Sequence, residues 1–247
     1  MPRVRADQLL VERGLAPSRA RAQALIMAGA VFVGERRVDK AGELLVAEAP
    51  IAVRGEDHPY VSRGGVKLAG ALDGFGVDPR GAHAVDVGAS TGGFTDVLLQ
   101  RGAVRVYAVD VGRGQLHARL RADPRVTVLE RTNARGLTPA LLGLDAPTLD
   151  LAVVDASFIG LEKLLPAIAS VLRPGGTLVA LVKPQFQVRR GEVGKGGVVR
   201  DDALRMRASA EVAEAARAVG FTVRGESDCV LAGPDGNRER FLWAEKA

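Results

Sequence analysis

Four charged side chains in separate parts of the 247-residue chain are placed where they could transfer protons. Asp155 directly follows the apolar run LDLAVV, and Lys183 directly follows the apolar run TLVALV. Lys67 precedes both runs, and Glu239 lies near the C-terminus in the sequence GNRERFLW. Ammonium and carboxylate groups are common acids and bases in enzymes. A charged residue after an apolar strand is also often only a solvated terminus, so each position alone has this simpler interpretation.

A glycine-rich turn provides a candidate ligand site. The sequence DVGASTGG occupies residues 86–93, and glycine lets the backbone approach a ligand closely. Asp110 ends the next apolar run, where a carboxylate can accept hydrogen bonds from the ribose hydroxyls of a nucleoside. Ser90 stands where the dinucleotide-binding fingerprint has a glycine. The turn and the acid together therefore indicate a nucleoside cofactor other than a dinucleotide.

The pattern of apolar runs predicts the elements that position these residues. Strands and helices alternate along the second part of the chain, which is typical of a parallel sheet covered on both faces. The carboxyl ends of such strands meet at one edge, where ligands bind. The predicted strands are 84–87, 104–109, 126–129, 149–154, 177–182, 222–223 and 241–243, and the predicted helices begin at Phe94 or span 161–171 and 203–219.

The first part of the chain predicts a separate small α+β module. A short helix is expected from Asp7 to Arg13, and a second helix is expected after Ser18, whose hydroxyl is a suitable N-cap. Apolar residues on both sides of Gly34-Glu35 predict a hairpin, and short strands are expected near Val46 and at 51–53.

Two polar segments lie outside these elements. The sequence RGEDHPYVSRGG, residues 54–65, predicts a linker that leads into a helix from Val66 to Gly74. The sequence PQFQVRRGEVGKGGVVR, residues 184–200, predicts a mobile substrate loop, with a simple surface loop as the alternative. Phe186 is a candidate for stacking on an extruded base, and a core position suits it equally.

Composition limits the classes of function. The net charge of +5 and a pI near 9.8 suit an anionic partner, although a solvated basic surface explains them equally well. No apolar run has the length of a membrane span, and the sequence shows no secretory signal, so we expect a cytoplasmic protein without membrane contact. Cys229 is the single cysteine, which excludes an internal disulfide. It is expected in a strand near Val230 as a small buried side chain.

The first module resembles the S4 RNA-binding domain. The sequence SRARAQALIMAGAVFVGERRV carries this likeness, which covers roughly the first 55 residues. The resemblance implies an S4-like domain at residues 1–58 that presents arginines to structured RNA. Guanidinium groups suit phosphate because they pair two oxygens at once. The implied RNA-binding residues are Ser18, Arg19, Arg21, Arg36 and Arg37.

The remainder of the chain resembles the FtsJ-like methyltransferases, and the whole chain resembles the TlyA family of rRNA methyltransferases, also known as haemolysins. The motifs are YVSRGGVKL, DVGASTGGFTD, VDVGRGQL, ERTNARGL, VVDASFIGL, LVKPQFQ and GPDGNRERF. The resemblance implies a linker at 59–65 and a Rossmann-like, S-adenosylmethionine-dependent methyltransferase domain at 66–247. The implied reaction is methylation of a ribose 2′-hydroxyl, of a cytidine in the family, with ribosomal RNA or ribosomal subunits as the partner.

The resemblance also implies a role for each candidate residue. Lys67, Asp155, Lys183 and Glu239 match the catalytic tetrad of the family, in which we assign Lys183 as the general base. A lysine can act as a base when neighbouring positive charges favour its neutral form. The reaction needs no metal. The implied cofactor-binding residues are Asp86, Gly88, Ala89, Ser90, Gly92, Gly93, Phe94, Asp110, Thr132, Asn133 and Asp155. Further candidates for RNA contact are Arg63, Arg189, Arg190 and Lys195.

Other functions explain fewer of these features. A membrane-active haemolysin would need an amphipathic or apolar membrane segment, and an RNA-binding protein with an inactive methyltransferase fold would not need the tetrad. Carbon-5 pyrimidine methylation needs a nucleophilic cysteine, and the aromatic Pro-Pro loop of amine methylases is absent after Asp155. The sequence leaves open the target nucleotide, the ribosomal subunit, the number of modified sites, the oligomeric state and whether any haemolytic activity is real.

Overall fold

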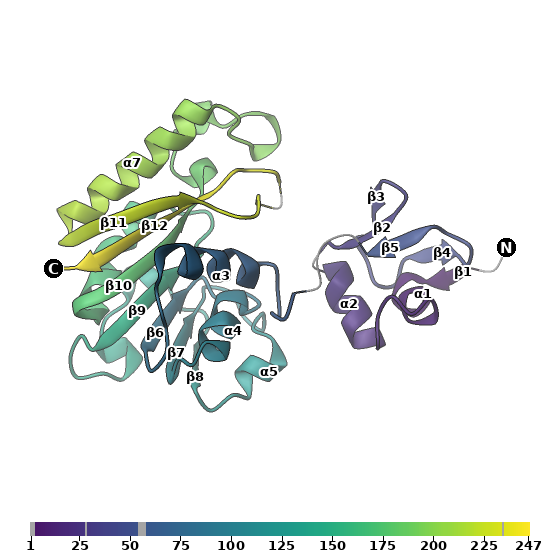
Figure 1. The fold of residues 1–247 in the computed structure, drawn as a ribbon, viewed down its shortest axis with the longest axis horizontal. Helices are drawn as coiled ribbons and strands as arrows, with labels where there is room; N and C mark the ends of the chain where they lie inside the picture. The colour runs from purple at the N-terminus through teal and green to yellow at the C-terminus, as the bar shows by residue number, and fades with distance from the viewer. Residues whose placement is uncertain (1–2, 28, 54–57, 234) are drawn as a thin grey trace. The chain divides into compact units, whose positions relative to one another are not determined.

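The chain forms two compact units, Met1–Pro59 and Tyr60–Ala247 (Figure 1). The computed structural model describes residues 3–27, 29–53, 58–233 and 235–247. The first unit contains the predicted RNA-binding module, and the second contains the predicted methyltransferase half. Each unit has its own hydrophobic core, so each is described by itself.

The first unit is an α+β fold, as its sequence predicts. Its helices are α1 (Ala6–Glu12) and α2 (Arg19–Met27). Its antiparallel strand pairs are β1 (Arg3–Arg5) with β4 (Leu44–Val46), and β2 (Val31–Val33) with both β3 (Arg36–Arg37) and β5 (Ile51–Val53). Leu9, Leu10, Ile26 and Val31 are almost completely buried in one cluster.

Local sequence signals explain where the elements of this unit begin and end. The Ser18 hydroxyl accepts a hydrogen bond from the Arg21 N–H at 3.2 Å, which confirms it as the cap of α2. Gly34 has a φ of +58°, the left-handed conformation that the tight turn between β2 and β3 requires.

The second unit is built around a seven-stranded sheet. Its strands are β6 (His83–Val87), β7 (Arg105–Val109), β8 (Val126–Leu129), β9 (Leu149–Val154), β10 (Leu172–Val182), β11 (Phe221–Asp228) and β12 (Arg240–Lys246). Their spatial order is β11-β12-β10-β9-β6-β7-β8. The first strand of this unit, β6, lies between β9 and β7, so the chain reverses its direction of winding beside β6. Ligands of open α/β sheets bind at this position, outside the carboxyl ends of the strands.

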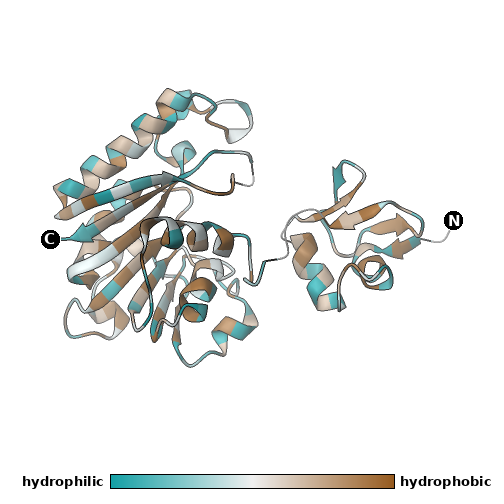
Figure 2. Cartoon of the chain, viewed as in Figure 1, coloured by the Kyte–Doolittle hydropathy of each residue, from teal (hydrophilic) through white to brown (hydrophobic). Residues whose placement is uncertain are grey.

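Helices cover both faces of this sheet. On one face, α3 (Gly64–Phe75), α4 (Gly93–Gln100) and α5 (Ala118–Arg121) contribute to one hydrophobic cluster, and on the other, α6 (Leu165–Val171) and α7 (Asp202–Ala218) contribute to a second. Successive strand residues supply the two clusters alternately, because side chains of a strand point to opposite faces. Figure 2 shows the resulting apolar character of the central strands and the mixed character of α7.

The sheet is not wholly parallel, which corrects the prediction from the strand–helix alternation. Strands β10, β9, β6, β7 and β8 are parallel, but β12 runs antiparallel to both β10 and β11. Among the described residues between β11 and β12 there is no helix, and a connection without a crossover joins neighbouring strands in antiparallel fashion. This hairpin carries Glu239 to the site, because Glu239 directly precedes β12.

The segment predicted as a linker, 59–65, is largely part of the second unit. The Val61 N–H donates to the Asp96 carboxylate at 2.8 Å, and Tyr60 and Val61 pack against the cluster around α3 and α4. Helix α3 begins at Gly64, two residues earlier than predicted. Gly65 leaves room for the Tyr60 ring, because a Cβ there would overlap it. Because the segment is mostly polar in composition, its sequence does not show that Tyr60 and Val61 pack against the second unit. Residues 54–57 of the predicted linker lie outside the described residues.

Candidate active site

The glycine turn joins the ends of three neighbouring strands. Gly88 follows β6 with a φ of +86°, and its N–H donates to the Val109 carbonyl at the end of β7 at 2.9 Å. A Cβ on Gly88 would lie 2.6 Å from the Asp155 carbonyl oxygen, at the end of β9. Glycine is therefore required at position 88 both by the backbone conformation and by the close approach of Asp155.

Asp110 is held against this turn by backbone donors. The Ser90 N–H donates to one carboxylate oxygen and the Gly112 N–H to the other, each at 2.7 Å. Ser90 adopts a φ of +48°, which turns its N–H toward Asp110. Each carboxylate oxygen can accept a second hydrogen bond, so Asp110 remains able to bind ribose hydroxyls.

Asp86 lies beneath the turn and is completely buried. Its Oδ2 accepts hydrogen bonds from the Thr95 backbone N–H at 2.9 Å and from the Thr95 hydroxyl at 2.6 Å. Burial raises the pKa of Asp86 to about 7, while the hydrogen bonds from Thr95 act in the opposite direction. Asp155 and Asp110 raise this pKa further through charge repulsion. A cation bound near the turn would therefore relieve the repulsion among these three carboxylates.

The predicted cofactor residues in and just after the glycine turn serve mainly the packing of the turn and of α4. Gly93 lets the start of α4 pack against the Ser62 side chain and the Gly65 backbone, and Gly92 (φ +96°) lies against Leu116 and Leu120. The side chain of Phe94 is 2% exposed and packs on Phe241 at 6.2 Å between ring centroids, so Phe94 serves the core. Ala89 is buried within the turn.

Thr132 and Asn133, at the end of β8, cap the local backbone. The Thr132 hydroxyl donates to the Glu130 carbonyl, and its N–H donates to the Asp110 carbonyl. The Asn133 side chain accepts from the Arg135 N–H at 3.0 Å. Loop capping, a common role for these residue types, therefore accounts for the hydrogen bonds of both side chains.

The strand register brings the four tetrad residues together. The Asp155 N–H donates to the Val87 carbonyl, next to Gly88, so Asp155 lies beside the glycine turn. Val182 pairs with Arg240 across β10 and β12, which places Lys183 and Glu239 beside each other where these strands meet. Lys67 reaches the same region from α3.

The four side chains form two ion pairs with different burial. Lys67 Nζ lies 2.5 Å from Glu239 Oε2, and these side chains are 9% and 1% exposed. Lys183 Nζ lies 2.5 Å from Asp155 Oδ1, and these side chains are 11% and 24% exposed. Both charges of the second pair act on Glu239, which shows that the two pairs are neighbours. Burial raises the pKa of Glu239, and the adjacent Lys67 ammonium opposes the rise.

Sequence reasoning missed two residues that follow Asp155. Lys183 Nζ donates to the Ser157 hydroxyl at 2.9 Å, so Ser157 helps to hold the proposed base. Phe158 is 90% exposed, has a φ of +64°, and its ring lies 5.2 Å from that of Phe186. A fully exposed aromatic side chain in a left-handed conformation is unusual and indicates a functional constraint. The signal in the sequence is the polar and aromatic run Asp-Ala-Ser-Phe directly after a buried strand.

Cys229 lies just beyond β11 instead of within a strand, which corrects the prediction. Its N–H donates to the Glu239 carbonyl at 2.9 Å, because the chain leaves the sheet here to form the loop before β12. Burial raises the pKa of the Cys229 thiol, which keeps it in its unreactive form. A nucleophilic role for this cysteine is therefore not supported.

Predicted RNA-binding residues are found in both units. In the first unit, three exposed arginines are paired with carboxylates: Arg19 with Asp7, Arg36 with Glu43 and Arg37 with Asp39. Ser18 is used as the cap of α2, and Arg21 is half-buried. In the second unit, Arg63 is exposed at the start of α3. Segment 184–200 forms three short 3₁₀ turns, and it exposes Arg189, Arg190 and Lys195.

Comparisons with known proteins agree with both units. Residues 60–246 match the model of the FtsJ-like methyltransferases, and residues 4–51 match the model of the S4 domain. The chain is 49% identical to the 16S/23S rRNA (cytidine-2′-O)-methyltransferase TlyA of Mycobacterium tuberculosis, over 98% of this chain and 89% of that protein. The chain belongs to the TlyA family of FtsJ-like methyltransferases.

Relatives of the chain carry two kinds of name. A protein of Brachyspira hyodysenteriae named Hemolysin A is 41% identical over 82% of this chain and 83% of its own length. A solved structure from Streptococcus thermophilus, described as a candidate hemolysin, is 41% identical with a TM-score of 0.78, and the match covers 100% of this chain and 90% of that one. Among the described residues, no helix has the length and apolar character needed to cross a membrane.

Proposed function

We propose that this protein transfers a methyl group from S-adenosylmethionine to the ribose 2′-hydroxyl of a cytidine in ribosomal RNA. The observation that carries the proposal is the gathering of the Lys67–Glu239 and Lys183–Asp155 pairs beside the glycine turn. The Mycobacterium tuberculosis relative is named for 2′-O-methylation of cytidine in rRNA, which supports the substrate. A protein that modifies ribosomal RNA would work in the cytoplasm.

The turn is chemically suited to a nucleoside cofactor with a positive charge. Gly88 keeps the turn free of side-chain atoms, and Asp110 offers two acceptor oxygens for ribose. Asp86 and Asp155 supply negative charge on the same side, and Asp86 Oδ1 is a buried oxygen without a hydrogen bond among the described residues. When bound, S-adenosylmethionine supplies an already activated methyl group on its sulfonium, so this chain has only to orient the hydroxyl and remove its proton.

Lys183 is the group that takes this proton. Lys183 would first release its own ammonium proton to solvent. Its uncharged Nζ would then take the proton of the 2′-hydroxyl as the oxygen replaces sulfur on the methyl carbon, and Asp155 at 2.5 Å would stabilise the ammonium that results. Ser157 fixes the direction of Nζ through its hydrogen bond. Lys67 and Glu239, being almost completely buried, hold the position of the neighbouring groups and give the site its charge balance.

The exposed ring of Phe158, the half-buried ring of Phe186 and nearby exposed basic side chains would bind the RNA. The rings of Phe158 and Phe186 offer a stacking surface next to Lys183, which suits an extruded base. The exposed groups Arg189, Arg190 and Lys195 would contact phosphate near this surface. The first unit, with its exposed arginines, would locate the structured RNA around the target.

The decisive experiment uses purified protein, tritiated S-adenosylmethionine and separated ribosomal subunits from a strain that lacks the enzyme. We expect tritium in rRNA, resistant to alkaline cleavage at a single cytidine per modified site. Mapping this nucleotide identifies the subunit and the reaction together. Label on a base, or label in protein only, would overturn the proposal.

A further inference from the structure

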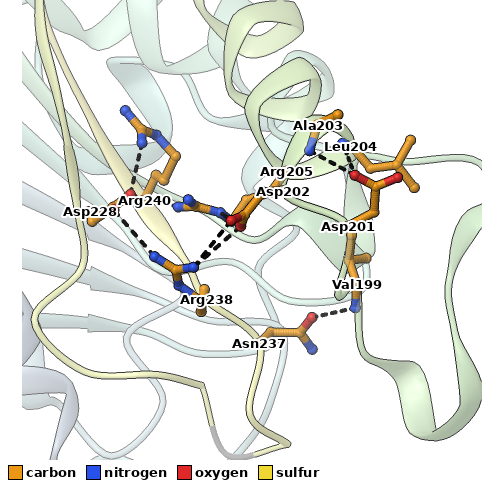
Figure 3. Close-up of polar contacts among 10 residues, drawn as sticks. All are labelled: Val199, Asp201, Asp202, Ala203, Leu204, Arg205, Asp228, Asn237, Arg238 and Arg240. Atoms are coloured by element: carbon orange, nitrogen blue, oxygen red, sulfur yellow. Dashed lines mark hydrogen bonds and ion pairs between the residues drawn. The ribbon is translucent and has the colours of Figure 1, made fainter.

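Besides carrying Glu239, the segment before β12 forms hydrogen bonds to segment 184–200 that the proposed reaction does not require. Asn237 lies two residues before Glu239, and only 1% of its surface is exposed. Its Oδ1 accepts a hydrogen bond from the Val199 N–H at 2.9 Å, which Figure 3 shows as a dashed line. Its Nδ2 donates to the Gly197 carbonyl at 2.9 Å. One buried side chain thus satisfies two backbone groups of segment 184–200.

The backbone of the segment before β12 packs against the tetrad. The Asn237 carbonyl accepts a hydrogen bond from the Gly233 N–H at 2.8 Å. A Cβ on Gly233 would lie 2.8 Å from Glu239 Oε1, so the turn that Asn237 closes is in contact with the Glu239 carboxylate. Glu239 in turn pairs with Lys67. A displacement of Asn237 would therefore shift the position of the Glu239–Lys67 ion pair.

Ion pairs next to Asn237 connect other elements. Arg238 pairs with Asp202 at 3.3 Å, and the nearly buried Arg205 pairs with both Asp202 and Asp228 (Figure 3). These pairs join the start of α7 to the end of β11. They anchor the segment before β12 to α7 and β11. Segment 184–200 has its own ion pair to α7, between Glu192 and Arg207, and among the described residues its side-chain contact with the segment before β12 is through Asn237.

Segment 184–200 is covalently continuous with Lys183, a member of the second ion pair of the tetrad. Lys183 directly precedes it, and Phe186, whose ring lies tilted against that of Phe158, is near its start. The far end of the segment, at Gly197 and Val199, is where Asn237 binds. The two hydrogen bonds of Asn237 therefore link the segment that follows Lys183 to the segment that carries Glu239.

We propose that Asn237 is a positioning residue that sets the exposed basic side chains of segment 184–200 relative to the tetrad. The inference rests on the proposed contact of this segment with RNA. Without the Asn237 amide, the Val199 N–H loses its buried acceptor, and the far end of the segment is released while Glu192 stays paired with Arg207 of α7. The RNA would then be held less often in the reactive geometry. Cofactor affinity would be unaffected, because the described side-chain hydrogen bonds of Asn237 go to residues 197 and 199 and not to the glycine turn.

The test compares Asn237→Ala and Asn237→Asp with Arg238→Ala as a matched control. We expect Asn237→Ala to raise the KM for rRNA about tenfold, with an unchanged Kd for S-adenosylmethionine. Hydrogen exchange at the Val199 amide should become fast in Asn237→Ala but remain slow in Asn237→Asp, which keeps the acceptor oxygen. Arg238→Ala should change neither measurement by more than about twofold. Fast exchange at Val199 in the unaltered protein would overturn the inference.

A double-mutant cycle with Arg190→Ala separates positioning from a general loss of structure. If Asn237 places Arg190, the rise in KM caused by Arg190→Ala should vanish in the Asn237→Ala background. Additive effects of the two changes would overturn the inference alone. If Arg190→Ala leaves KM unchanged in the otherwise unaltered protein, the proposed RNA contact of this residue fails as well, and the inference falls with it.

Discussion

The two ion pairs of the candidate site have the same chemistry but different surroundings. Lys67 and Glu239 are almost completely buried, whereas the Lys183–Asp155 pair is partly open to solvent through Asp155. A buried pair has lost its water and cannot exchange partners easily, so it is suited to fixing a structure. A partly open pair can meet a substrate, so it is suited to proton transfer. The difference lies mainly in the carboxylates, since Glu239 is 1% exposed and Asp155 is 24% exposed, while the two lysines are 9% and 11% exposed. It therefore separates the tasks of the two pairs, and residue types alone do not.

The largest effect is expected from removal of Lys183, the lysine of the more open pair. Lys183→Ala should lower kcat for rRNA methylation by about 10²–10⁴-fold, the range typical for loss of a general base. The Kd for S-adenosylmethionine should stay within about twofold, because the glycine turn is untouched. Single-turnover methyl transfer and calorimetric cofactor binding measure the two effects. Activity close to that of the unaltered protein would remove Lys183 as the base.

Removal of one partner of the buried pair should mainly affect stability. Lys67→Met leaves the Glu239 carboxylate buried without its cation, and such losses cost about 3–5 kcal/mol in free energy of unfolding. Lys67→Met combined with Glu239→Leu should be less destabilising than Lys67→Met alone, because no charge then stays uncompensated. Urea unfolding of the second unit, followed by the fluorescence of Trp243, measures both variants. A double variant that is less stable than the single variant would contradict a structural task for this pair.

Asp86 extends the comparison to a buried carboxylate with no cation among its described side-chain partners. Its pKa of about 7 is above the value near 3.8 that it has in an unfolded chain. Between these values the folded state binds more protons than the unfolded state, so stability falls as the pH rises. We expect the free energy of unfolding to drop by about 2–4 kcal/mol from pH 4 to pH 8 through this group.

Asp86→Asn is the matching variant for this pH dependence. An asparagine oxygen can still accept both hydrogen bonds from Thr95, so the fold of the turn should persist. The fall in stability between pH 4 and pH 8 should then be smaller by the amount that Asp86 contributes. Equal pH profiles for the two proteins would show that Asp86 does not titrate in this range.

The sequence predicts the strands of the second unit and the residues at their ends because buried strands are continuous apolar runs. Asp155 and Lys183 could be located in this way, since each directly follows such a run. The proximity of Glu239 to Lys183 could not be predicted from periodicity, because it depends on a register between β10 and β12 that only the folded sheet defines. The antiparallel direction of β12 was missed for the same reason.

The side chains whose placement the sequence did not reveal depend on backbone conformation and on packing. Phe158 has a positive φ and is exposed, and nothing in its residue type predicts either property. Phe94 lies in a recognisable motif, yet its side chain is used by the core. Tyr60 and Val61 anchor a polar segment to the second unit through contacts with residues far along the chain. Each of these depends on long-range contacts that a local sequence pattern does not specify.

The smallest effect is expected from an ion pair of the first unit that is more exposed to solvent than either pair of the candidate site. Arg36 and Glu43 lie 2.7 Å apart, and the arginine is 59% exposed, so water and salt weaken their attraction. Arg36→Ala should therefore change the stability of this unit by less than about 1 kcal/mol. If Arg36 contacts phosphate, the same variant should raise the KM for rRNA a few-fold and reduce the salt dependence of RNA binding by about one counterion.

Glu43→Gln is the control for Arg36→Ala, since it breaks the ion pair but keeps the guanidinium. It should leave RNA binding unchanged or slightly strengthen it, because it removes a competing carboxylate. A loss of RNA affinity in Glu43→Gln as large as in Arg36→Ala would mean that the pair shapes the fold of this unit and that Arg36 does not reach the RNA.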